Sequence, residues 1–196
     1  MAAQWLSGRG FERVYNLNGG IRAWQGIKAK GPVELNLEII SGEETPAKMI
    51  EIAYGFEGAL EKFYRTVIDQ GRDQSVTALL KLLWAVEERH KRMLLELYQG
   101  LKSSADQELT PLDERSAGIM EGGFKFAEFL EQNEEVLQTP TGVLDLAMMI
   151  ETQALDLYLR FGQKMALQST KEILNQIADE EKGHLSALGK LLEEQI

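Results

Sequence analysis

Long helical periodicity interrupted by glutamate is the feature that most constrains the fold of this chain. From about residue 43 onward, apolar residues recur every three or four positions, as they do on one face of a helix. We expect four helices: one over about 44–70, one from the Gly71–Asp73 turn to about Gly100, one opening at Thr139–Thr141, and one capped by Ser169. The residues predicted to face the core are Ile50, Ala53, Leu60, Tyr64 and Val67; Val76, Leu80, Leu83, Leu94 and Leu97; Leu144, Ala147, Ala154, Tyr158, Phe161 and Met165; and Ile173, Ile177, Leu188 and Leu191.

Each apolar stripe has a gap at its centre, and a glutamate fills it, joined on two helices by a histidine. The residues in these gaps are Glu57 on the first helix, Glu87 and His90 on the second, Glu151 on the third, and Glu181 and His184 on the fourth. Glu87 follows Glu57 by 30 positions and Glu181 follows Glu151 by the same 30, so the first helix pair recurs as the second. A turn lies midway in each interval, so each glutamate of a pair is about 15 residues from it. At a rise of 1.5 Å per residue, both glutamates lie roughly 22 Å from the turn. The six side chains are therefore predicted to meet in one layer.

Loop lengths determine how the four helices connect. Short turns make the first and second helices antiparallel neighbours, and the same holds for the third and fourth. The connection from 103 to 136, which contains a shorter helical piece, is long enough to return the chain to the other end of the bundle. The fold class is therefore all-α, a four-helix bundle with a long crossover, which is the ferritin-like topology.

Six buried polar groups at one level indicate a metal site. A buried, ionised carboxylate without a partner costs several kcal/mol, and two divalent cations would satisfy all four glutamates. Glu-x-x-His places a carboxylate and an imidazole on one helix face, and mixed oxygen and nitrogen ligands favour iron or manganese, with zinc able to substitute. An isolated Glu-x-x-His is more often a solvated pair, but here both histidines of the chain occur in that pattern. Tyr64 and Tyr158, each seven residues after a glutamate, are either core aromatics or hydrogen-bond donors to the ligands.

Composition excludes several function classes. The net charge of −10 would repel nucleic-acid phosphates. Zero cysteines exclude thiolate metal sites, iron–sulfur clusters and disulfides. No apolar run reaches the roughly 18 residues of a membrane span, and the first residues lack the pattern of a signal peptide, so we expect no membrane partner and a cytoplasmic location.

The region 43–196 resembles the rubrerythrin-like branch of the ferritin-like diiron carboxylate proteins. The matching motifs are Glu57 with Tyr64, Glu87–His90, Glu151 with Tyr158, and Glu180–His184. The resemblance implies a diiron centre that reacts with peroxide or dioxygen in defence against oxidative stress. Two family features are missing: the appended four-cysteine iron domain, and a further carboxylate one turn from the third-helix glutamate, where Met148 and Ala154 flank Glu151.

Residues 1–31 resemble the closing segment of a rhodanese domain, through Gly10–Leu17 and Gly19–Trp24, and 32–42 is read as a linker. Sulfur transfer by this chain is excluded, because the rhodanese nucleophile is a cysteine. The apolar residues of this remnant, such as Trp5, Phe11 and Trp24, would otherwise be exposed, which favours a homodimer.

The leading functional hypothesis is a diiron oxidoreductase that reduces peroxide or dioxygen and is re-reduced by an external electron donor. Glu57 and Glu151 are assigned as terminal ligands, Glu87 and Glu181 as bridges, and His90 and His184 as one ligand to each iron. Two alternatives stay open: a non-catalytic iron-binding or iron-storage protein, and an interaction module that uses the bundle as a scaffold.

Overall fold

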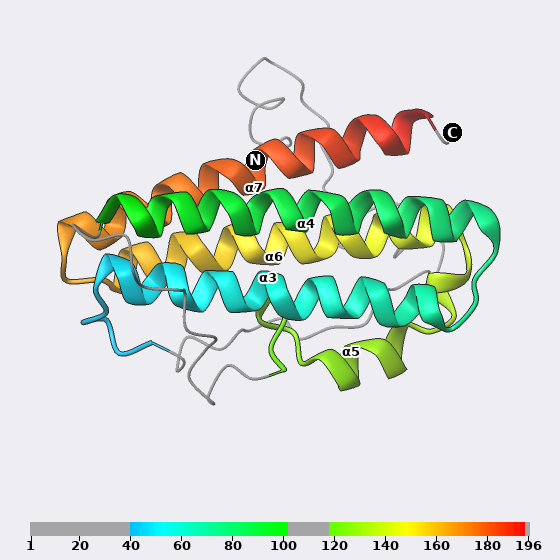
Figure 1. Ribbon diagram of the computed structural model, residues 1–196, viewed down its shortest axis with the longest axis horizontal. Coiled ribbons are helices and arrows are strands. Elements are labelled where there is room, and N and C mark those ends of the chain that lie inside the picture. The colour runs from blue at the N-terminus through cyan, green and yellow to red at the C-terminus, as the bar shows by residue number, and fades with distance from the viewer. Residues whose placement is uncertain (1–39, 102–117, 195–196) are drawn as a thin grey trace, which may run out of the picture.

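The computed structural model describes residues 40–101 and 118–194. In these two ranges the chain is an all-α bundle of four long helices, with one shorter helix beside them (Figure 1). The predicted rhodanese remnant at 1–31, most of the linker at 32–42 and the polar stretch at 103–115 lie outside the described residues.

The first helix pair begins and ends close to the predicted positions. Helix α3 spans Pro46–Asp69, and the Thr45 side chain caps it by accepting a hydrogen bond from the backbone N–H of Lys48. Gly71, with φ of 78°, makes the turn into α4, which spans Gln74–Leu101. The Asp73 carboxylate accepts the N–H groups of Ser75 and Val76, which satisfies donors that a helix start leaves unpaired.

The second helix pair is built in the same way, and it corrects one prediction. Helix α6 spans Pro140–Lys164, with Thr139 as its cap and proline in its first turn. Helix α7 spans Gln168–Glu194. The prediction that Ser169 is the N-cap is therefore wrong, because Ser169 already lies inside the first turn of α7.

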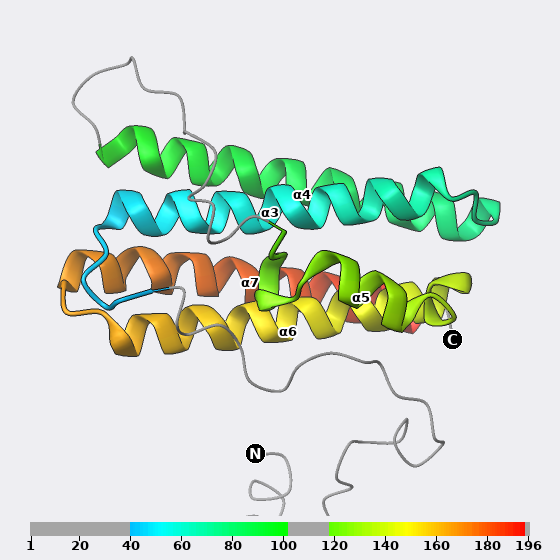
Figure 2. The same cartoon turned by 90° about the horizontal axis from the view of Figure 1, so that it is seen from below.

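The crossover between α4 and α6 contains short elements that run along the outside of α3 and α6 (Figure 2). They are the 3-10 turn η3 (Glu121–Gly123), helix α5 (Phe126–Asn133) and the 3-10 turn η4 (Val136–Gln138). The predicted shorter helical piece is α5. Of these elements, η3 packs most extensively against α6 and also touches α3, so the crossover covers one face of the bundle.

The apolar core is divided in two along the length of the bundle. One cluster includes Ala53, Leu94 and Ala154, and the other includes Leu60, Leu83 and Ala147. These residues flank the glutamates in the sequence, so the predicted polar layer separates two apolar clusters. Each cluster draws on all four long helices, and this fixes the height at which the helices meet.

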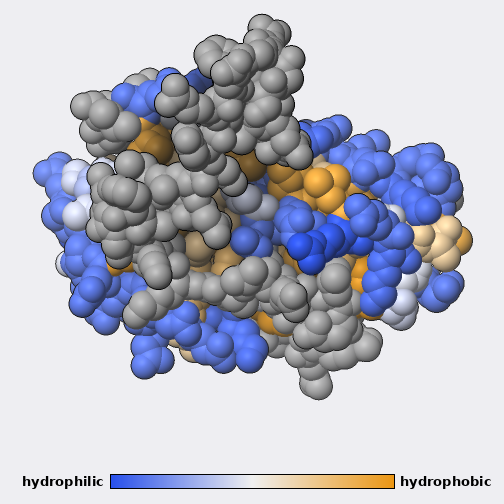
Figure 3. Space-filling view, turned by 180° about the vertical axis from the view of Figure 1, so that it is seen from behind, coloured by the Kyte–Doolittle hydropathy of each residue, from blue (hydrophilic) through white to orange (hydrophobic). Residues whose placement is uncertain are grey.

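The outer surface is mixed in character. Figure 3 shows hydrophilic side chains over much of the face opposite to that of Figure 1, with apolar side chains reaching the surface between them. Among the helices that the structure describes, none combines the length and apolar character needed to cross a bilayer.

Candidate metal centre

The six side chains predicted to converge do so in the middle of the bundle. Five of them are almost completely buried, with exposed fractions of 1% for Glu57, 0% for Glu87 and Glu181, 3% for Glu151 and 4% for His90. The sixth, His184, has 16% of its side chain exposed. Because α3 packs on α4 and α6 packs on α7, each helix pair contributes one Glu and one Glu-x-x-His to the same layer.

The two pairs repeat each other in their contacts. Nδ1 of His90 is hydrogen-bonded to Oε1 of Glu57 at 2.7 Å. In the second pair, Nδ1 of His184 lies 3.5 Å from Oε2 of Glu151 and 3.8 Å from Oε2 of Glu181. In both pairs, the histidine of the second helix therefore approaches the glutamate of the first.

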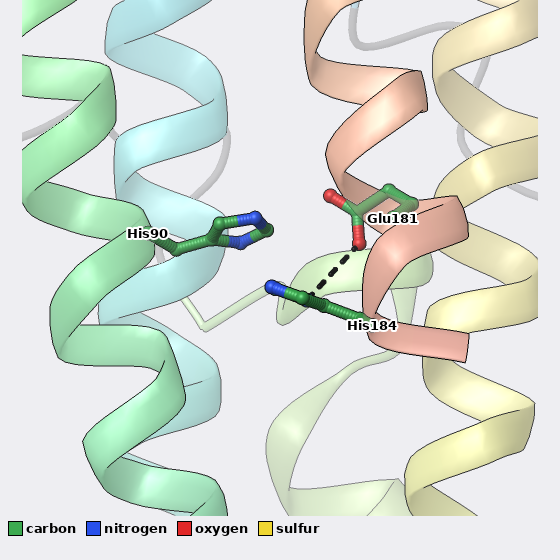
Figure 4. A group of neighbouring side chains, drawn as sticks. All are labelled: His90, Glu181 and His184. Carbon is green, nitrogen blue, oxygen red and sulfur yellow. Dashed lines mark ion pairs between the residues drawn. The ribbon is translucent and has the colours of Figure 1, made fainter. Parts of the chain in front are cut away.

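The two histidines meet where α4 faces α7. Their ring centroids are 3.8 Å apart, with an interplanar angle of 37°. Figure 4 shows His90 extending from α4 toward His184 and Glu181, which come from α7. The two halves of the predicted repeat are thus joined at one site.

A fifth carboxylate, Glu121, belongs to the same layer and was not predicted. It is completely buried and comes from the 3-10 turn η3 in the crossover, not from a long helix. Its Oε1 accepts a hydrogen bond of 3.2 Å from the hydroxyl of Tyr158. The expectation that this chain has no further carboxylate beside Glu151 is therefore incomplete: Met148 and Ala154 do flank Glu151 on its helix, but Glu121 approaches from outside it.

Local backbone geometry brings Glu121 to the site. Gly122 and Gly123 have φ values of 72° and 82°, a backbone region that residues other than glycine rarely adopt. A Cβ at Gly122 would lie 3.0 Å from the backbone oxygen of Ile150, the residue before Glu151. The turn can therefore pack directly on α6 only because glycine stands at this position. The sequence does carry a signal for it, namely a lone acid followed by Gly-Gly between apolar residues.

The site offers three overlapping groups of donor atoms that could hold metal ions. The groups are Glu57, Glu87, His90 and Glu121; Glu121, Glu151 and Glu181; and His90, Glu181 and His184, each with donor atoms within 4.8 Å of one another. Glu121 is the residue shared by the two carboxylate-rich groups. Oxygen and imidazole donors in this arrangement are suited to iron, manganese or zinc.

The unpaired donor atoms fit such ions. Within the described part of the chain, both carboxylate oxygens of Glu87 and of Glu181, Nε2 of His90 and Nδ1 of His184 are buried without a hydrogen-bond partner. Leaving so many buried polar atoms unpaired is costly unless cations or protons occupy the site. Five carboxylates carry a formal charge close to that needed to balance two divalent cations.

The protonation of the carboxylates reflects this crowding. Burial raises the pKa of Glu57, Glu87 and Glu181 well above the usual range, and neighbouring carboxylates raise it further. Burial likewise raises the pKa of Glu121. Burial alone would also raise the pKa of Glu151, but the adjacent His184 and Glu181 hold it below its ordinary value. Without cations, the site therefore retains protons that metal binding would displace.

The two tyrosines differ in what they contact. Tyr158 is hydrogen-bonded to Glu121, whereas the buried hydroxyl of Tyr64 has no hydrogen-bond partner among the residues that the structure places. Burial raises the pKa of both phenols well above 10.0, and nearby carboxylates add to the shift. Both therefore stay protonated, and Tyr158 can act as a donor to the site.

Comparison with known proteins agrees with this geometry. The sequence model of the Rubrerythrin family matches residues 142–195, which include Glu151, Glu181 and His184. This match supports a rubrerythrin-like, ferritin-like assignment.

Structural comparison finds a solved chain with a similar fold. The chain is similar to a solved structure described as a hypothetical protein from Pyrococcus furiosus, with a TM-score of 0.51 and 19% sequence identity over 82% of this chain and 95% of that one. No curated protein matches the sequence. The rubrerythrin-like match covers the second helix pair, and the contacts of Glu57 and His90 extend the same ligand pattern to the first pair.

Proposed function

We propose that this chain is a dinuclear-metal oxidoreductase that holds two iron ions and reduces peroxide or dioxygen. The observation that carries the proposal is the convergence of five buried carboxylates and two histidines on one layer, with donor atoms that lack hydrogen-bond partners within the described ranges. Two ferrous ions held there would supply the two electrons that cleavage of an O–O bond requires. An external electron donor would then return the centre to the ferrous state.

The protein side chains have separable roles in this proposal. Glu57 and Glu151 would be the terminal carboxylates, and His90 and His184 would each provide one nitrogen donor. Glu87 and Glu181 would be the bridging carboxylates assigned from the sequence, and Glu121 could hold either ion because it belongs to both carboxylate groups.

Tyr158 can support the charge of Glu121. The phenol of Tyr158 is buried and stays protonated, and it donates a hydrogen bond to Glu121. This hydrogen bond would stabilise negative charge on Glu121 as the charge of the centre changes. The apolar clusters flank the layer on both sides along the length of the bundle.

The decisive experiment is anaerobic loading with ferrous iron followed by rapid mixing with hydrogen peroxide. We expect two irons per chain and oxidation of the bound iron much faster than oxidation of free ferrous ion. Glu87→Gln should lose metal and rapid oxidation. Glu88→Gln is the matched control, because Glu88 lies next in the sequence but its side chain is 47% exposed and ion-paired to Lys91. Loading below one iron per chain, or oxidation no faster than that of free iron, would count against the proposal.

A further inference from the structure

A groove leads from the surface to the candidate metal centre between α4 and α7. It has a volume of about 740 Å³. In the view of Figure 1, α7 diverges from α4 toward the C-terminal end of α7. The close helix pairs of the bundle are α3 with α4 and α6 with α7, and α4 and α7 pack less closely on each other.

The floor of the groove consists of residues of the metal site. Glu87, His90, Glu151 and His184 all line it. Glu87 is completely buried and His90 is 4% exposed, yet both oxygens of Glu87 and Nε2 of His90 have no hydrogen-bond partner in the described part of the chain. These atoms are the donors assigned to the metal ions, so the groove ends at the candidate metal layer.

The walls of the groove are mostly apolar. The apolar wall residues are Leu82, Val86 and Met93 from α4, and Ala187, Leu188 and Leu191 from α7; the charged residues Arg89, Glu180 and Lys190 also line the groove. Leu82 is 46% exposed, so part of the apolar wall is open to solvent. Walls of this kind favour a ligand with an apolar body.

The opposite side of the metal layer is covered by protein. There the turn η3 packs on α6 and α3, and Glu121 reaches the layer from it. Approach through that side would require the crossover to move. The groove between α4 and α7 gives a direct approach without such movement.

The size of the groove does not match hydrogen peroxide. A water molecule has a share of about 30 Å³ in the liquid, and hydrogen peroxide is only slightly larger. Sites for organic small molecules typically measure about 300–1,000 Å³. A groove of 740 Å³ would therefore be mostly filled with water against leucine and valine side chains if hydrogen peroxide were its ligand.

We infer that the groove binds an organic hydroperoxide, with its apolar body between α4 and α7 and its O–O group at the metal layer. The inference rests on the proposed peroxide reduction and names the substrate class of that site. The reaction takes ROOH, two electrons and two protons to ROH and water. The O–O bond breaks, two ferrous ions, when bound, would supply one electron each, and each oxygen receives a proton from water. A one-electron carrier protein supplies the two electrons that restore the ferrous centre.

The binding step can be tested without turnover, because the alcohol product shares the apolar body of the substrate. Primary alcohols from butanol to octanol are titrated by calorimetry into protein loaded with redox-inert zinc. We expect affinity to rise roughly fourfold per added CH₂. Ala187→Trp, which fills the groove from an exposed position of α7, should lower octanol affinity at least tenfold, and Ser186→Trp provides a second variant of the same kind. Ala127→Trp is the matched control, at an exposed position of α5 outside the groove.

Turnover measurements distinguish failure of this inference from failure of the proposed function. In ferrous protein, the ratio of kcat/KM for cumene hydroperoxide to that for hydrogen peroxide should exceed one, and Ala187→Trp should lower that ratio at least tenfold relative to Ala127→Trp. Rapid oxidation by hydrogen peroxide, with slow oxidation by cumene hydroperoxide and no binding of octanol, would overturn the inference and leave the proposed function standing. Binding of octanol with no oxidation by either peroxide would overturn both.

A second copy of the chain covering the groove would also overturn the inference. In that case octanol would not bind, and sedimentation would show a dimer that Ala187→Trp dissociates and Ala127→Trp does not.

Discussion

The hydroxyl of Tyr158 on α6 donates a hydrogen bond of 3.2 Å to Oε1 of Glu121 on the crossover. This contact joins a residue of the second helix pair to a segment that lies between the pairs in the sequence. It holds Glu121 in the position where it belongs to both carboxylate groups. The crossover is therefore part of the candidate metal centre and not only a connection.

Loss of this hydrogen bond should weaken metal binding. We expect Tyr158→Phe to lower metal affinity by about 10- to 100-fold, because partners that orient ligands commonly have effects of that size. Tyr64→Phe is the matched control, since the buried Tyr64 hydroxyl makes no hydrogen bond within the described residues and its removal leaves no acceptor unpaired. Competition with a chromophoric chelator measures both affinities. Equal losses in the two variants would show that the hydrogen bond to Glu121 is not the cause.

Glu121 should also control the redox balance of the centre. Five ionised carboxylates and two divalent cations give the site a net charge close to neutral. The net charge is also close to neutral when both cations are oxidised to the trivalent state. Glu121→Gln removes a negative charge and should raise the midpoint potential by on the order of 100 mV, since a unit charge a few ångströms away has an effect of that order. Redox titration of iron-loaded protein measures the shift. Glu128→Gln, at a carboxylate with 63% of its side chain exposed, should leave the potential unchanged.

The predictions succeeded where a residue is placed by helical periodicity. The glutamates and histidines of the long helices stand at fixed spacings in apolar stripes, so a repeat of 3.6 residues and two turns of known length are enough to bring them together. The same reasoning predicted the long crossover, and α5 lies within the segment predicted to hold a shorter helix.

Glu121 could not be placed in this way. Its position depends on the positive φ values of Gly122 and Gly123 and on the close approach of η3 to Ile150. Neither follows from periodicity, because a turn has no repeating face and its contact with α6 is made across a long sequence separation. The divergence of α7 from α4 in Figure 1 likewise has no signal in helical periodicity.

The pH dependence of the metal-free protein follows from the shifted pKa values. Glu57, Glu87, Glu121 and Glu181 have raised pKa values in the folded chain, so the stability they contribute is complete below their ordinary value of 4.5 and is lost as pH rises through the raised values. Glu151, with a lowered pKa, contributes stability that increases with pH, but the four carboxylates with raised pKa values outnumber it. We expect the unfolding temperature of metal-free protein to fall between pH 5 and 8, and bound metal to reverse the trend because it replaces the protons.

Two variants distinguish how the buried carboxylates and the general acidity of the chain each contribute to the pH dependence of stability. The net charge of −10 also destabilises the fold as pH rises. Glu87→Gln removes one buried ionisable group and should flatten the decline in unfolding temperature, whereas Glu88→Gln should leave its slope unchanged. Parallel slopes for the two variants would refute the assignment of the effect to the buried layer.

Glycine at position 122 should be required for both stability and metal binding. Ala at this position would have to adopt φ of 72° and would bring its Cβ within 3.0 Å of the backbone oxygen of Ile150 and of the Phe124 ring. We expect Gly122→Ala to lower the free energy of unfolding by roughly 1–3 kcal/mol and to move Glu121 away from the metal layer, with loss of metal affinity. Gly189→Ala, on α7 with open space around its Cβ, should instead raise the free energy of unfolding by about 0.5–1 kcal/mol. Chemical denaturation with chelator and with zinc measures both effects, and a Gly122→Ala protein with normal stability and normal metal affinity would show that η3 does not need this close approach to α6.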